Sequence, residues 1–206
     1  MKSYIAIICL SFLGFSNAFS QGLNVGDKAD GFKLKNTDGK FVSLSDYPDA
    51  KGFTVIFTCN HCPYAKAYQD RIIALDKKYK SKGYPVIAIN SNDPETVPED
   101  SYANMVIRAK EKGFTFPYLF DETQSVCRKF GAKRTPHVFL LQKNGADLFV
   151  RYIGAIDDNF EDATKVSTPY LANAIDALLS GSTPEPSFTK AIGCTIKEKP
   201  VKIAGN

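Results

Sequence analysis

Apolar positions along the chain alternate between strand-like and helix-like spacing, and this alternation predicts the fold. Near the N-terminus, two short alternating runs flank Asn36-Thr37-Asp38-Gly39. Asp-Gly between such runs is a strong signal for a β-hairpin. Residues 53–57 are almost continuously apolar, as expected for a strand that is covered on both faces. Helical spacing follows until Gly83, carried by Tyr64, Tyr68, Ile72, Leu75 and Tyr79.

The alternation of strands and helices continues through the second half of the chain. We predict strands at 85–90 and 116–120 and helices at 99–112, 123–130 and 169–179, with Asp121 capping the middle helix. Asn144-Gly145 separates two further apolar runs, 137–141 and 148–153, and predicts a second hairpin. Alternating elements of this kind favour an α/β fold with a central mixed sheet and helices on both faces.

The N-terminus has the pattern of an export signal. Lys2 precedes an apolar run over residues 5–15, and small residues suited to cleavage follow at 16–20. An apolar run this short does not cross a hydrocarbon core of about 30 Å, so we expect no permanent membrane span. The predicted organisation is a signal peptide at 1–20, a domain at 21–182 and a poorly structured tail at 183–206. We therefore expect export to the periplasm or cell envelope.

The composition is that of a globular protein, and the net charge argues against a nucleic-acid partner. Of the 206 residues, 44% are hydrophobic and 23% are charged. The formal net charge of +4 is too small to argue for a nucleic-acid partner, and no block of basic residues stands out.

The strongest chemical signal is the pair Cys59 and Cys62, which follows a buried strand and opens a long helix. Unpaired N–H groups and the helix dipole stabilise a thiolate at such a position. A disulfide that closes so short a loop adds little stability. A zinc site would need a second pair of cysteines, which the sequence lacks. The pair is therefore interpreted as a redox-active dithiol that needs no other cofactor. His61 lies between the sulfurs, and an imidazole there is expected to favour the thiolate.

Three interpretations stay open for Cys127 and Cys194, the remaining cysteines of the exported chain. They form a disulfide that pins the tail, or Cys194 folds back as a third redox partner, or both are free thiols.

Several longer motifs resemble one family. They are Val25-Gly26-Asp27-Lys28-Ala29, Cys59-Asn60-His61-Cys62-Pro63-Tyr64, Asn90-Ser91-Asn92-Asp93-Pro94 and Gly193-Cys194-Thr195-Ile196-Lys197. Over residues 22–199 the chain resembles the thioredoxin superfamily, in particular the extracytoplasmic proteins similar to alkyl hydroperoxide reductase and thiol-specific antioxidant (the peroxiredoxin-like-1 group). The resemblance implies a thioredoxin-like fold, Cys59 as the attacking thiolate and Cys62 as the resolving thiol. It also implies a cis Pro136 that faces them, with Thr135 offering backbone groups to a substrate peptide.

The chain also departs from the pattern of this superfamily. Thr58 stands where thioredoxins usually carry Trp, and residues 51–57 contain no acid to take a proton from the resolving thiol. The Thr-x-x-Cys of true peroxiredoxins is missing, which weakens the case for peroxide reduction.

We therefore expect a monomeric or weakly associated thiol–disulfide oxidoreductase. Its partners are protein thiols and disulfides, together with a membrane or periplasmic dithiol protein that supplies or accepts electrons. Two alternatives stay open: a thiol-dependent peroxidase, and a copper-binding protein without turnover that uses Cys59, Cys62 and His137 as ligands.

Overall fold

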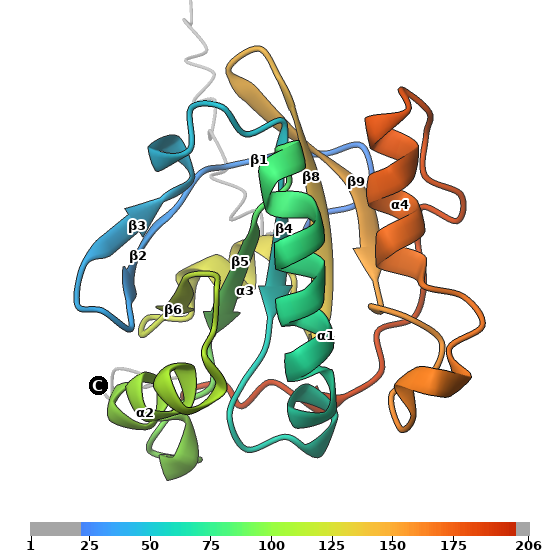
Figure 1. The fold of residues 1–206 in the computed structure, drawn as a ribbon. Helices are drawn as coiled ribbons and strands as arrows, with labels where there is room; N and C mark the ends of the chain where they lie inside the picture. Colours follow the sequence, from blue (N-terminus) through green and yellow to red (C-terminus); the bar gives the residue numbers. More distant parts are fainter. Residues whose placement is uncertain (1–21, 201–206) are drawn as a thin grey trace, which may run out of the picture.

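An eight-stranded mixed sheet runs through residues 22–200, the part of the chain that this computed structural model describes (Figure 1). The strand order is β1-β9-β8-β4-β5-β6-β2-β3, with β4, β5 and β6 parallel to one another. Its strands are β1 (Lys28–Ala29), β2 (Lys33–Asn36), β3 (Phe41–Ser43), β4 (Gly52–Phe57), β5 (Val86–Asn90), β6 (Tyr118–Phe120), β8 (His137–Asn144) and β9 (Asp147–Gly154). A separate small sheet pairs β7 (Arg134–Thr135) with β10 (Cys194–Thr195).

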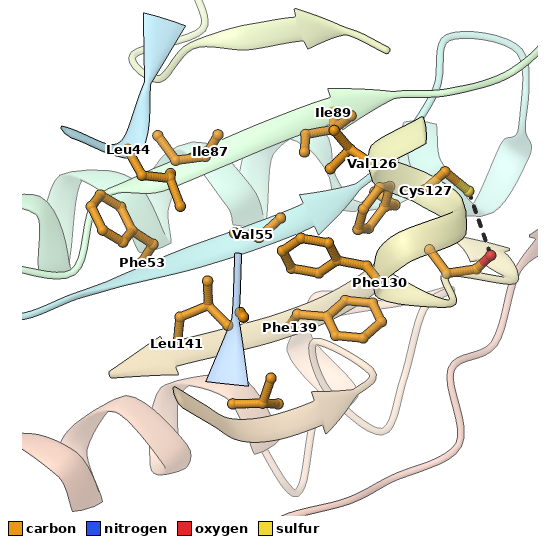
Figure 2. Packing of buried hydrophobic residues seen from close by; sticks show 14 of the residues in the cluster. Leu44, Phe53, Val55, Ile87, Ile89, Val126, Cys127, Phe130, Phe139 and Leu141 are labelled. Atoms are coloured by element: carbon orange, nitrogen blue, oxygen red, sulfur yellow. Dashed lines mark hydrogen bonds between the residues drawn. The ribbon is translucent and has the colours of Figure 1, made fainter. Parts of the chain in front are cut away.

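Helices pack on both faces of the sheet, as the sequence predicts. They are α1 (Pro63–Tyr79), α2 (Tyr102–Lys112), α3 (Ser125–Phe130) and α4 (Tyr170–Leu179). Buried side chains of α1 and α4 join one apolar cluster, and those of α3 join a second cluster across the sheet. Figure 2 shows the second cluster, in which Phe130 of α3 packs against Phe139 of β8. Phe57 of β4 also packs against Phe130. The predicted α/β fold is confirmed.

The two predicted hairpins are also confirmed. β2 and β3 pair antiparallel around Gly39, which has a positive φ of 86°, and β8 and β9 pair antiparallel around Gly145. Glycine adopts such a backbone without the steric cost that a side chain brings.

Two helix starts differ from the sequence prediction. Helix α2 begins at Tyr102 rather than Glu99, because Pro98–Asp100 form a separate 3₁₀ turn. The N-cap of α3 is Gln124 and not Asp121. The Asp121 carboxylate still accepts a hydrogen bond of 2.8 Å from the Cys127 N–H, so it satisfies a free donor of the first turn without being the cap.

The predicted poorly structured tail is held against the body of the protein as far as the structure describes it. In Figure 1 the red C-terminal segment leaves α4 and crosses past the N-terminal end of α1. The backbones of Ser187 and Thr189 hydrogen-bond to Ile153, and Ile196 is buried in the apolar core. The Lys197 N–H donates to Asn92 at 2.8 Å. Proline and lysine content suggested a loose segment, but backbone hydrogen bonds and the burial of Ile196 position it.

The predicted signal peptide lies outside the described residues. Within 22–200, every helix is too short or too polar to reach across a bilayer.

Candidate redox site

The fold places the dithiol where a strand of the sheet passes into its longest described helix. β4 ends at Phe57, and the N–H of Thr58 still bonds to the carbonyl of Ile89 at 2.8 Å. Cys62 is then the N-cap of α1, and Pro63 occupies the first turn, where its missing N–H costs nothing. Both sulfurs therefore lie beside the unpaired N–H groups and the positive end of the helix dipole.

Both sulfurs contact Thr135, the residue that the family resemblance assigned to substrate binding. The Cys59 sulfur lies 3.2 Å from the Thr135 hydroxyl, and the Cys62 sulfur lies 3.3 Å from the Thr135 carbonyl oxygen. The peptide bond between Thr135 and Pro136 is cis, as expected. The two cysteines are almost inaccessible, with exposures of 1% and 0%.

The pKa values of Cys59 and Cys62 are shifted in opposite directions. The Cys59 thiol donates to Cys62, and together with hydrogen bonds from Cys194 and the Ala65 N–H this lowers the pKa of Cys62 to about 4. That same donation, burial and the nearby charge of Asp100 raise the pKa of Cys59. The reduced pair therefore carries one negative charge that donors at the start of α1 stabilise. The assignment of Cys59 as the attacking sulfur and Cys62 as the resolving one stays a prediction.

A buried carboxylate, Asp100, organises the loop between the sulfurs. It accepts hydrogen bonds from the backbone N–H of Asn60 at 2.6 Å and from Nδ1 of His61 at 2.5 Å. Asn92 donates to the same carboxylate at 2.7 Å, and the Asp100 side chain is fully buried. Sequence reasoning found no acid for this site, because it searched only the strand before the motif. Asp100 comes from the 3₁₀ turn before α2, and its surroundings in the sequence carry no signal for a role at the dithiol.

Asp100 also changes the interpretation of His61. The imidazole lies between the two cysteines, as expected, but its Nδ1 donates to the carboxylate. The ring therefore belongs to an Asp–His pair, with a ring nitrogen within 4.8 Å of the Cys59 sulfur.

The copper ligand set with His137 does not form. His137 packs against Phe139, and its Nδ1 accepts from the Lys133 N–H at 3.2 Å. Among the described residues, one group brings three candidate ligand atoms within 4.8 Å of one another, and it consists of Cys59, His61 and Asp100. A carboxylate that already accepts several hydrogen bonds is a poor ligand for a soft ion such as Cu(I). The described residues therefore do not bring Cys59, Cys62 and His137 together as the proposed ligand set.

The first of the three interpretations, a disulfide between Cys127 and Cys194, does not hold in the structure, where both are free thiols in different surroundings. Cys127 belongs to the apolar cluster on the α3 face, where its thiol donates to the Ala132 carbonyl at 3.6 Å (Figure 2). Burial raises the pKa of Cys127 to about 12. Cys194 instead packs against Cys59, Cys62 and Ala65. A disulfide between these two cysteines therefore does not attach the C-terminal segment to α3.

Comparison with known proteins places the chain in a family. The model of the AhpC/TSA family matches residues 25–152, which include the entry hairpin, the dithiol and the central strands. The chain belongs to the AhpC/TSA family. Its sequence is 25% identical over 174 residues to the thiol-disulfide oxidoreductase ResA of Halalkalibacterium halodurans, and the match covers 81% of this chain and 93% of that protein.

Two solved structures are similar over nearly the whole of their length. An uncharacterized conserved protein from Geobacillus kaustophilus is 38% identical, with a TM-score of 0.79, over 91% of this chain and 99% of that one. A hypothetical protein from Sinorhizobium meliloti is 30% identical, also with a TM-score of 0.79, over 87% and 97% of the two chains. This AhpC/TSA protein thus has the thioredoxin-like fold, and its distant likeness to ResA supports a redox enzyme in general.

Proposed function

We propose that this AhpC/TSA protein is an extracytoplasmic thiol–disulfide oxidoreductase that exchanges disulfides with protein partners through Cys59 and Cys62. The observation that carries the proposal is the pair itself: two sulfurs at the start of α1, where the helix end stabilises a thiolate, and both against Thr135. The thiolate is the nucleophile of disulfide exchange, so the reduced site is prepared for attack.

The exchange uses both sulfurs in turn. One sulfur of the pair, as a thiolate, attacks one sulfur of a substrate disulfide, forms a mixed disulfide and releases the other substrate sulfur as a thiolate. The second sulfur of the pair gives up its proton to that thiolate and attacks the first. The remaining substrate thiolate leaves, and the enzyme holds a Cys59–Cys62 disulfide. The reverse sequence oxidises a substrate dithiol, and the balance between the two depends on reduction potentials.

Residues around the dithiol support these steps by position. The Thr135 hydroxyl lies against Cys59, where it lowers the pKa of that thiol and partly offsets the effect of Asp100. The Asp100 carboxylate accepts from the backbone N–H groups of Asn60 and His61, so the two sulfurs keep their spacing when the disulfide opens.

The location belongs to the proposal as well. An apolar run after Lys2 followed by small residues favours export, and an oxidising compartment is where a stable protein disulfide serves as substrate. The proposed partners are exported proteins with thiols or disulfides and a dithiol protein that exchanges electrons with this one.

A peptide that carries a fluorophore and a quencher across a disulfide tests this function. The reduced protein is expected to cleave it, and Cys62→Ser is expected to abolish repeated turnover with glutathione as reductant. Cys127→Ser is the matched control and should retain the wild-type rate, because Cys127 is buried away from the site. Wild-type turnover that survives in Cys62→Ser, or no turnover at all, would contradict the proposal.

A further inference from the structure

Cys194 forms a three-sulfur cluster with the dithiol, although it lies far away in the sequence. Its side chain packs against Cys59, Cys62 and Ala65. It lies close enough to Cys62 for each thiol to shift the pKa of the other. The mechanism described above leaves this third thiol unused.

Backbone pairing and a buried neighbour in the C-terminal segment fix the position of Cys194. Cys194 pairs with Thr135 in the β7–β10 ladder, and the next residue but one, Ile196, is buried. A Cβ at Gly193 would lie 2.1 Å from the Thr135 carbonyl oxygen, so the segment approaches this loop as closely as only glycine permits. The backbone that carries Cys194 is thus held directly over the dithiol.

The three sulfurs differ in accessibility. Cys59 and Cys62 are 1% and 0% exposed, whereas Cys194 is partly exposed. The segment that carries Cys194 also occupies the backbone edge of Thr135, the edge that a substrate peptide was expected to use. With the segment in place, a large protein partner therefore reaches Cys194 more easily than either sulfur of the dithiol.

The charges around Cys194 change with the redox state of its neighbour. Burial and the contact with Cys62 raise the pKa of Cys194 to about 11, while Lys197 and Arg134 lower it. When Cys62 is part of a disulfide it carries no charge, and its contribution to the raised pKa of Cys194 disappears. Cys194 is therefore a better nucleophile when the dithiol is oxidised than when it is reduced.

We propose that Cys194 is a third redox cysteine that relays the disulfide between the buried dithiol and protein partners. This inference rests on the proposed function, because it requires a redox-active Cys59–Cys62 pair.

In the first step the Cys194 sulfur attacks Cys62 within the Cys59–Cys62 disulfide. A Cys62–Cys194 disulfide forms, and Cys59 leaves and takes up the proton that Cys194 gave up. The step is an internal exchange that needs no further oxidant. In the second step a thiolate of the partner attacks Cys194 and releases Cys62 as its stabilised thiolate. A second partner thiol resolves the mixed disulfide, so the partner is oxidised to a disulfide and the enzyme is reduced.

Disulfide mapping of the full chain tests the relay. In Cys59→Ser, treatment with oxidised glutathione is expected to produce a Cys62–Cys194 disulfide, and adding Cys127→Ser should not change that product. Glutathione attached to Cys62 beside a free Cys194 would overturn the relay. Wild-type protein is treated in parallel. Failure of wild type to form Cys59–Cys62 would overturn the proposed function instead, so the two failures are distinguishable.

Exchange rates give a second readout. Oxidised wild type and oxidised Cys194→Ser are each mixed with a reduced, unfolded protein that contains two thiols. The relay predicts that Cys194→Ser still forms the Cys59–Cys62 disulfide but loses most of the exchange rate with this protein. An equal or faster rate would overturn the relay, since it would mean that the C-terminal segment only covers the site.

Discussion

The carboxylate of Asp100 lies 2.5 Å from Nδ1 of His61, a residue 39 positions earlier in the chain. The same carboxylate accepts from the backbone N–H groups of Asn60 and His61, and it is fully buried. A buried carboxylate is stable only when it is hydrogen-bonded and paired. The residues between the two cysteines supply that pairing, so the dithiol loop and the turn before α2 stabilise one another.

Replacing this carboxylate is expected to affect both stability and the thiols. Asp100→Asn keeps the size of the side chain but puts an N–H₂ group where acceptors are needed, and we expect a loss of about 3 kcal/mol in the free energy of unfolding. The pKa of Cys59 should fall, because the charge that raises it is gone. Urea unfolding and the thiolate absorbance of the native protein measure these changes.

Glu99→Gln is the matched control for Asp100→Asn. The Glu99 side chain is exposed, and only its backbone carbonyl contacts the loop, as the acceptor for Asn60. Its free energy of unfolding and the pKa values of its thiols should match those of wild type. Equal effects of the two substitutions would refute the role given to Asp100.

Single-cysteine variants of the pair are expected to show which sulfur carries the charge. In Cys59→Ser the serine hydroxyl still donates to Cys62 and the Ala65 N–H remains, so a thiolate should persist well below the pKa of 9.0 that an unperturbed thiol has. In Cys62→Ser the remaining Cys59 is buried near Asp100, so its pKa should stay above that value. Ultraviolet thiolate absorbance as a function of pH measures both, and the opposite order would assign the charge to Cys59.

His137 is expected to make the protein less stable in mild acid. Burial and the charge of Lys133 lower the pKa of His137 from 6.5 to about 4. As the pH falls through that interval the unfolded chain binds a proton that the folded chain does not, so stability decreases toward acid and is fully retained above 6.5. The loss amounts to at most about 3 kcal/mol.

His137→Gln isolates this contribution. Its amide oxygen is able to accept the hydrogen bond from Lys133 without titrating. Denaturant unfolding at a series of pH values should show a smaller decrease below neutrality than in wild type. An identical decrease in both proteins would exclude His137 as its source.

The close approach of the C-terminal segment to Thr135 makes Gly193 a sensitive position. A methyl group there would lie 2.1 Å from the Thr135 carbonyl oxygen, which is backbone and has little freedom to move. Gly193→Ala should therefore displace the segment, lower stability by about 1–3 kcal/mol and speed the alkylation of Cys62 in the native protein. Gly31→Ala, whose Cβ would meet nothing within 4 Å, should change neither quantity. Unchanged alkylation in Gly193→Ala would show that the segment does not cover the dithiol.

Local sequence patterns predicted the elements of this fold because each one carries its own signal. The helical spacing of Tyr64, Tyr68 and Ile72 found α1, and the Asp-Gly and Asn-Gly turns found both hairpins. The dithiol was found in the same way, since Cys59 and Cys62 are close in sequence and lie at a boundary between elements.

Long-range relationships escaped prediction because nothing local specifies them. Asp100 reaches the dithiol only through the packing of the turn before α2, and no spacing rule links it to Asn60. Proline and lysine made the C-terminal segment look loose, whereas its order comes from one buried side chain, Ile196, and from hydrogen bonds to distant loops. The charge on Cys62 likewise depends on the sulfur of Cys194, which only the tertiary structure brings near.

The most direct measurement equilibrates the protein with mixtures of reduced and oxidised glutathione and maps its disulfides. The account predicts a reversible, two-electron interconversion between free thiols and an intramolecular disulfide that contains Cys62, with Cys127 reduced throughout. A protein whose Cys59 and Cys62 stay as thiols in every mixture, or take up glutathione without bridging, would contradict a redox function for this pair.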